Sequence, residues 1–311
     1  MATHDYVIDN ASGSAVRTDL NNVLQAVLTN NSSGSAPSTT AAYMLWADTS
    51  NNILKMRNSA NDGWIDLRTL TGGLTSTADA TINSVTVGKG ANSVAGNTVL
   101  GENALDASVT GADNTAIGNS ALTALTSGAN NVAVGHDAMI ANTTGASNVA
   151  IGDMAMRDNT TASDNTAVGR AALHVNTTGA DNTAIGRGAL ANSTTASNNT
   201  AVGKSALTAD TTGGFNTAVG SGALDSNTTA DSNVAIGYVA LGANTTGTAN
   251  VAVGVGAADA NTTGINLSAI GYGALGQNTT ANNNTAVGYN SLGANTTGAN
   301  NVAVGSNALD A

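Results

Sequence analysis

The sequence predicts an all-β chain dominated by a parallel β-solenoid. A 17-residue unit recurs from Gly101 to Gly305 without insertion or deletion. This unit is too short for a helical hairpin, which takes about 34 residues in known helical repeats. Within its Thr/Val-Ala-Val/Ile phrase, the side chains alternate with the period of two that is typical of a strand. We therefore expect each unit to form one coil, with two or three short strands joined by tight turns.

The repeat is best followed through the glycine that ends each Asn-Thr-Ala-Val-Gly phrase, here called the anchor glycine. The anchor glycines are Gly101, Gly118, Gly135, Gly152, Gly169, Gly186, Gly203, Gly220, Gly237, Gly254, Gly271, Gly288 and Gly305. An earlier phrase, residues 83–88, resembles an atypical first coil. Parallel strands stack about 4.8 Å apart, so thirteen coils give a shaft of about 60 Å.

The repeat also predicts which side chains fill the core. We expect the Val or Ile before each anchor glycine, and the Leu four residues after it, to point inward. The Ala three residues after the anchor marks a place where only a small side chain fits. The Ala between Thr/Val and Val/Ile should then face outward, in a flat Ala and Gly strip. Such a strip suits packing against identical chains, and we expect a homotrimer around a three-fold axis.

An asparagine precedes the strand phrase in nearly every coil. Stacked asparagines can hydrogen-bond from coil to coil and satisfy backbone groups at a corner. The expected structural ladder includes Asn114, Asn131, Asn148, Asn165, Asn182 and Asn199. Leu267 takes the asparagine position in one coil, so a local irregularity is expected there.

Residues 1–70 differ from the repeat and predict a small α+β module. Apolar residues spaced for one helical face predict a helix at about residues 18–29. Strand-like segments at 43–47, 53–57 and 64–70, separated by turn-rich segments, predict a β-meander. Residues 71–82 are expected to be a linker, and residues 83–311 the solenoid shaft.

Composition excludes several kinds of partner. The net charge is −11 with a pI near 4.3, which argues against nucleic acid, because phosphate binding needs clustered Lys and Arg. No apolar stretch approaches the roughly 18 residues of a spanning helix, so we expect no membrane insertion. Cysteine is absent, which excludes disulfides and thiolate metal sites.

No catalytic arrangement stands out, and we expect neither an enzyme nor a bound cofactor or metal. His4, His136 and His174 occupy different repeat positions, so they would not stack into a metal ladder. The acidic residues do not follow the calcium-binding pattern of Gly-rich β-roll repeats.

The position just after the anchor glycine varies most, and we call it the corner stripe. It carries a basic group, Arg170, Arg187 and Lys204, and then an aromatic group, Tyr238, Tyr272 and Tyr289. Like charges on neighbouring strands repel, so the basic side chains should face solvent or an acidic neighbour such as Asp153. The stripe is either a surface that recognises anionic or sugar groups, or ordinary variation at an exposed corner or subunit contact.

Two resemblances add to this pattern. The phrase Asn83-Ser-Val-Thr-Val-Gly, with the repeats that follow, resembles the head repeats of trimeric autotransporter adhesins, which implies a left-handed, trimeric β-roll. The segments Asp5-Tyr-Val-Ile-Asp-Asn and Trp46-Ala-Asp-Thr-Ser-Asn-Asn resemble the start of tail-fibre proteins of tailed phages that infect cyanobacteria and other marine bacteria. That resemblance implies a virion fibre whose N-terminal module docks to other virion proteins.

The sequence therefore favours a structural virion protein that projects a rigid trimeric shaft for adhesion to a host-surface glycan or protein. A capsid-attached fibre is one alternative. A bacterial trimeric surface adhesin is another, although the first residues do not resemble a secretory signal. An ice-binding solenoid is a third, because Thr143-Thr144 and Thr160-Thr161 begin two threonine ladders. Adjacent threonines would, however, point to opposite faces.

Overall fold

A computed structural model describes residues 34–36, 44–69 and 79–310, and the chain divides into two compact units, Met1–Ala78 and Asp79–Ala311. In the described residues the regular structure is β, apart from one 3₁₀ turn at Ala91–Ser93. The all-β class predicted from the repeat is confirmed. The helix predicted at residues 18–29 lies outside the described residues.

The first unit contains an antiparallel three-stranded sheet in the order β1-β2-β3. The strands are β1 (Leu45–Asp48), β2 (Ile53–Arg57) and β3 (Trp64–Thr69), which matches the predicted meander. Trp46 is buried and its ring centroid lies 5.2 Å from that of Trp64. Lys55 and Arg57 sit over these two rings at 5.4 and 5.3 Å, so cation–π contacts line one face of the meander.

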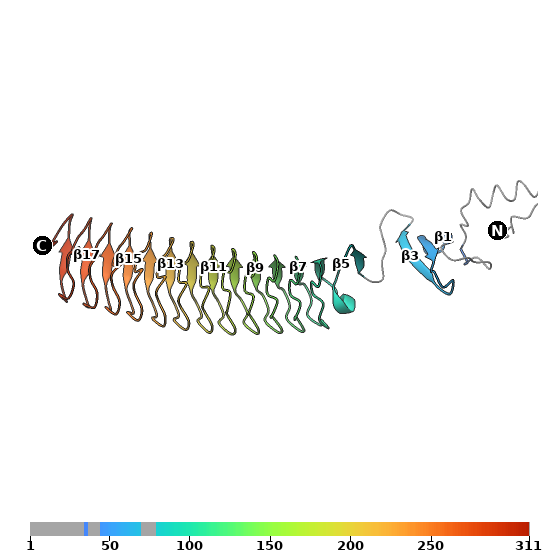
Figure 1. The fold of residues 1–311 in the computed structure, drawn as a ribbon, viewed down its shortest axis with the longest axis horizontal. Coiled ribbons are helices and arrows are strands. Elements are labelled where there is room, and N and C mark those ends of the chain that lie inside the picture. The colour runs from blue at the N-terminus through green and yellow to red at the C-terminus, as the bar shows by residue number, and fades with distance from the viewer. Residues whose placement is uncertain (1–33, 37–43, 70–78, 311) are drawn as a thin grey trace, which may run out of the picture. The chain divides into compact units, whose positions relative to one another are not determined.

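The second unit is one 15-stranded sheet whose strands follow each other in sequence order from β4 to β18 (Figure 1). It opens with antiparallel pairs between β4 (Ala80–Ile82), β5 (Val85–Gly88) and β6 (Thr98–Gly101). Two expectations are corrected here. Residues 80–82 form a strand rather than the end of a linker, and residues 83–88 belong to an antiparallel hairpin rather than to a first coil.

From β6 onward every pair is parallel and in register, so each residue lies beside the one 17 positions later, as in Thr166 beside Thr183. This confirms the parallel solenoid with 17-residue coils. The remaining strands are β7 (Thr115–Ile117), β8 (Val132–Val134), β9 (Val149–Ile151), β10 (Thr166–Val168), β11 (Thr183–Ile185), β12 (Thr200–Val202), β13 (Thr217–Val219), β14 (Val234–Ile236), β15 (Val251–Val253), β16 (Ser268–Ile270), β17 (Thr285–Val287) and β18 (Val302–Val304).

Each repeat contributes one strand, not the two or three that we expected. The rest of the coil is a series of turns that also stack through backbone hydrogen bonds. For example, the N–H of Leu173 donates to the carbonyl of Ala189 at 2.9 Å, and the N–H of Thr177 donates to that of Thr194 at 2.9 Å. Turns can therefore replace strands in a solenoid wall, provided that their backbone groups find partners in the next coil.

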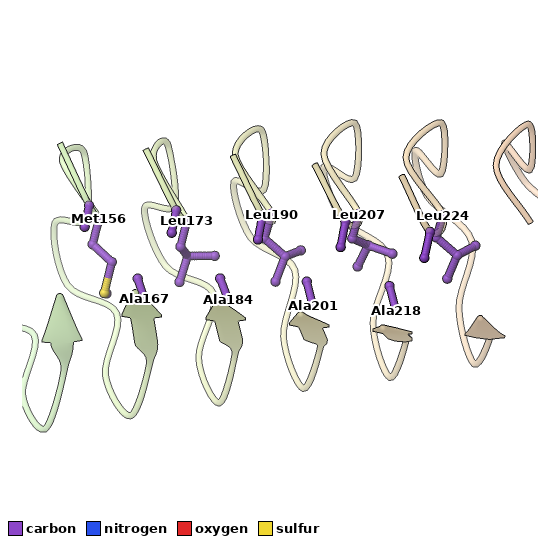
Figure 2. Packing of buried hydrophobic residues seen from close by; sticks show 14 of the residues in the cluster. Met156, Ala167, Leu173, Ala184, Leu190, Ala201, Leu207, Ala218 and Leu224 are labelled. Carbon is purple, nitrogen blue, oxygen red and sulfur yellow. The ribbon is translucent and has the colours of Figure 1, made fainter. Parts of the chain in front are cut away.

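The core consists of two stacked rows of buried side chains, one of alanine and one largely of leucine. The central Ala of each strand is buried and points toward the Leu four residues after the anchor glycine, as Ala184 and Leu190 show (Figure 2). The predicted inward Leu and the small Ala three residues after the anchor are confirmed. The expected orientation of the strand was wrong, because the Val/Ile side chains point outward, with Ile185 40% exposed. The leucine row already fills the narrow interior, so only a methyl group fits opposite it.

The anchor glycines allow the coils to approach closely at the corner after the strand. Gly203 has a φ of +140°, and a Cβ there would lie 2.5 Å from the carbonyl oxygen of Gly220 in the next coil. Both the backbone angle and the space exclude a side chain. The spacing of the coils at this corner therefore depends on glycine.

Candidate functional site

The first asparagine ladder is present as predicted. Asn131 shows its pattern: Oδ1 accepts the backbone N–H of Asn148 at 3.0 Å, and Nδ2 donates to the carbonyl of Gly145 at 2.9 Å and to Asn114 Oδ1 at 3.1 Å. The ladder residues Asn114, Asn131, Asn148, Asn165, Asn182 and Asn199 are all buried. They hold neighbouring coils together and are not available to a ligand.

Leu267 interrupts this ladder without disturbing the strand register. Its own N–H still donates to Asn250 Oδ1 at 2.9 Å, and Ser268 stays in register with Val251. The irregularity is confined to hydrogen bonding, because a leucine offers no acceptor to the N–H of Asn284 in the next coil.

A second buried ladder was not predicted, although the Asn-Thr-Thr phrase of the repeat carries it. Asn176 is typical: Nδ2 donates to Asn159 Oδ1 at 3.2 Å and to the carbonyl of Gly179 at 2.8 Å. Its members are Asn142, Asn159, Asn176, Ser193, Asp210, Asn227, Asn244, Asn261, Asn278 and Asn295. Fixed recurrence of an amide at a second position of the coil was the signal that could have revealed it.

Removing one rung of the first ladder is expected to destabilise the shaft. Asn131→Ala leaves buried partners in two coils unpaired and opens a cavity, which should cost about 2 kcal/mol. Asn131→Leu should cost less than the alanine variant, since Leu267 shows that leucine fills this space. Urea unfolding of the two variants and the parent measures the difference. Equal stability of all three would contradict a structural role for the ladder.

The corner stripe begins with charged residues. Arg170 Nε lies 3.3 Å from Asp153 Oδ2, and His136 Nδ1 lies 3.1 Å from Asp153 Oδ1. The expected acidic neighbour is therefore confirmed for Arg170. Arg187 and Lys204 are exposed and make no ion pair within the part of the chain that the structure describes. Exposed pairs of this kind contribute little to stability.

The aromatic part of the stripe lies in the C-terminal coils. The rings of Tyr272 and Tyr289 stack on each other, with centroids 5.4 Å apart and planes inclined by 13°. Tyr238 occupies the same position two coils before Tyr272, with the smaller Val255 between them. All three tyrosines are more than half exposed, so their rings form a row that solvent reaches.

A groove of about 680 Å³ runs beside this row. Its lining includes Tyr238, Val255, Tyr272, Asp259 and Gln277, together with the glycines Gly256, Gly273, Gly276 and Gly293. Because glycine has no side chain, these glycines in consecutive coils leave a hollow in the surface. Glycine recurs at two positions of these coils. This recurrence was a sequence signal for the groove, which the corner stripe alone did not reveal.

The chemistry of the groove is aromatic, amide and acidic. The Asp259 carboxyl lies beside Gly256, because a Cβ on that glycine would be 3.7 Å from Asp259 Oδ2. Partial burial raises the pKa of Asp259 above its ordinary value of 3.8, while hydrogen bonds from the backbone of Ala260 and of Asp259 itself act to lower it. No Lys, Arg or His follows Lys204 in the sequence. The groove therefore offers stacking faces and hydrogen-bond acceptors without a positive charge.

The described residues contain no group of three or more His, Asp or Glu side chains that could hold a metal ion. None of the helical segments in the described part of the chain is long and apolar enough to span a membrane. In the threonine ladder that begins at Thr143, hydroxyls donate to a backbone carbonyl of the next coil, as Thr143 does to Thr160 at 3.0 Å.

These features define the chain as a parallel β-solenoid repeat protein whose second unit is held together by two internal side-chain ladders. No family model matches the sequence, and neither a curated protein nor a solved structure matches the chain.

Proposed function

We propose that this chain is a structural virion fibre protein, attached to the particle through its N-terminal module and projecting a rigid trimeric shaft for adhesion to a host surface. The observation that carries the proposal is the unbroken register of the coils from β6 to β18. Each coil is bound to the next along the strand and the turns, and most coils are also joined through both ladders. Such a stack resists bending and suits a spacer that holds two attachment points apart.

The separate N-terminal unit fits the attachment role. Its sheet is distinct from the shaft and carries the partly exposed side chains of Trp64, Lys55 and Arg57 on one face. Aromatic residues and arginine are enriched at protein interfaces. The resemblance of this region to tail-fibre proteins supports docking to other virion proteins.

The proposed trimer uses a different surface from the one expected from the sequence. Val and Ile of the strands form an outer row that is partly exposed in every coil. It contains Ile117, Val134, Ile151, Val168, Ile185, Val202, Val219, Ile236, Val253, Ile270, Val287 and Val304. A continuous apolar row of this length is typical of an interaction surface. In the proposed trimer this row, rather than an alanine strip, faces the identical chains.

Charges placed in the outer row should therefore disrupt the trimer. The double variant Ile185→Asp, Val202→Asp is expected to be monomeric, because three copies would bury six carboxylates near one axis. The control is Thr195→Asp, an exposed residue of the same coils outside the row. Native mass spectrometry and sedimentation measure the oligomer. A parent chain that is monomeric would reject the trimer.

The location and role are tested on intact particles. Antibody labelling of this protein should decorate fibres on the virion, and its position separates tail from capsid attachment. Labelling of cell surfaces without any labelling of particles would instead favour the bacterial adhesin.

A further inference from the structure

We propose that the groove beside Tyr238, Tyr272 and Tyr289 binds a neutral, hydroxyl-rich oligosaccharide. This inference deepens the adhesion role and rests on the proposed function only for its biological context. The binding itself is a property of the chain that can be measured alone.

The length of the site favours an extended ligand. From Tyr238 to Tyr289 the row covers three coil steps, or roughly 14 Å at the spacing of a parallel sheet. Tyr272 stacks on Tyr289, and the same position in the preceding coil carries the shorter Val255. A site of this length exceeds a single sugar ring, so the ligand should be an oligosaccharide extended along the shaft.

Flat and polar groups lie together in the groove. One face of a sugar ring presents C–H groups and can stack on an aromatic face, while its hydroxyl groups point to the side. The groove is lined by the aromatic rings of Tyr238 and Tyr272 together with the acceptors of Asp259 and Gln277. Concave sites that combine apolar walls with a few polar groups are typical of small-ligand binding.

The charge of the C-terminal coils decides between the two ligand classes suggested by the corner stripe, anionic groups and neutral sugars. The residues after Lys204 include Asp210, Asp225, Asp231, Asp259 and Asp310 and no basic residue. An acidic sugar would therefore meet only repulsion in this groove. Arg170, Arg187 and Lys204 lie in earlier coils, so the basic and aromatic parts of the stripe are separate surfaces.

The glycines of the lining support the same conclusion. Gly276 and Gly293 both lie five residues after an anchor glycine and both line the groove. The same position carries Asp259 in the coil of Val255, and Arg157 and His174 in coils nearer the N-terminus. The surface is thus hollowed in the same coils that carry Tyr272 and its stacked partner Tyr289.

The test uses the full-length chain and a panel of immobilised hexasaccharides. The neutral members are hexamers of glucose, galactose, mannose, xylose and N-acetylglucosamine, and the anionic member is a hexamer of galacturonic acid. We expect binding to at least one neutral hexamer, little change between low and high salt, and no binding to the galacturonic acid hexamer.

The decisive variant is Tyr238→Ser, Tyr272→Ser. Ser221 and Ser306 occupy the same position in their own coils, so serine is compatible with the fold. Loss of two stacking faces should weaken binding of the neutral hexamer at least about fivefold. The matched control is Phe215→Ser, which removes an exposed aromatic ring at a different corner and should leave binding unchanged.

Three results would overturn the inference: no binding to any neutral hexamer, equal binding after the tyrosine substitutions, or stronger binding to the galacturonic acid hexamer. These results are distinguishable from failure of the fibre proposal. If the protein is absent from virions but binds a neutral hexamer through the tyrosines, the groove stands and the virion role falls. If the protein is on virions but does not bind a neutral hexamer through the tyrosines, the virion role stands and the groove proposal falls.

Discussion

Replacing the anchor residue Gly203 with alanine is expected to destabilise the shaft by about 3–4 kcal/mol. The added Cβ would meet the backbone of Gly220, with 2.5 Å to its oxygen and 2.6 Å to its carbonyl carbon. Neither atom belongs to a flexible side chain, so the two coils must separate or the backbone must leave its φ of +140°. Urea unfolding, together with hydrogen exchange of the coils on either side of Gly203, measures the loss.

A matched control exists in the preceding coil, two residues after its anchor glycine Gly186. Gly188 also has a positive φ, but a Cβ there would meet nothing closer than 3.9 Å. Ser120 and Ser205 occupy the same position in other coils with φ of 58°. Gly188→Ser should therefore cost no more than about 1–2 kcal/mol, which is the strain of a left-handed residue without a clash. A similar loss in both variants would show that backbone angle, and not the approach of the coils, sets the requirement for glycine.

Replacing Asp210 with asparagine is expected to stabilise the shaft at neutral and alkaline pH. Asp210 is fully buried in the second ladder, and burial is the main cause that raises its pKa from 3.8 to about 7. Its Oδ1 accepts from Asn227 at 2.9 Å and from the N–H of Gly213 at 3.2 Å, while Oδ2 has no hydrogen-bond partner. Ser193 Oγ, in the preceding coil, has none either.

The pH dependence follows from the direction of this shift. The folded state holds the proton more tightly than the unfolded state, so stability is greatest below about pH 4 and falls as the pH rises toward 7. The deprotonated form should cost about 2–4 kcal/mol, at about 1.4 kcal/mol for each pKa unit. Asp210→Asn should recover this energy at about pH 8 and show little difference from the parent at about pH 4.

The asparagine would also restore the ladder. Its Nδ2 can donate to Ser193 and to the carbonyl of Gly213, in the way that Asn176 donates to Asn159 and Gly179. Asp164→Asn, at an exposed position, is the control for the loss of one carboxylate. Thermal unfolding of the parent and both variants, at about pH 4 and about pH 8, provides the measurement. An Asp210→Asn variant that gains nothing under the alkaline condition would reject the assignment.

The sequence predicted the features that depend on strict repetition. The 17-residue period, the parallel class, the buried Leu and the first asparagine ladder all follow from residues that recur in nearly every coil. The direction of the strand side chains did not follow, because Thr-Ala-Val alternates equally well with either face inward. The volume between the strand and the Leu row decides that question, and this volume is known only once the coil is folded.

The candidate site was predicted only in part for a similar reason. The tyrosines of the corner stripe stand out because they are aromatic at a repeated position. Asp259 and Gln277 lie at different positions of the coil, and their proximity to the stripe depends on how the turn after the Leu folds back. The recurring glycines were visible in the sequence, but they indicate a hollow only once the side chains around them have been placed by the fold.

The identical junction between successive coils has a consequence for the gene that encodes them. Each coil presents the same strand register to its neighbours, and most coils also present the same ladder groups. Unequal recombination between two repeats would therefore delete or duplicate whole coils without creating an unfamiliar junction. Related genes should then differ in length by multiples of one repeat. The number of repeats in the gene would set the length of the shaft.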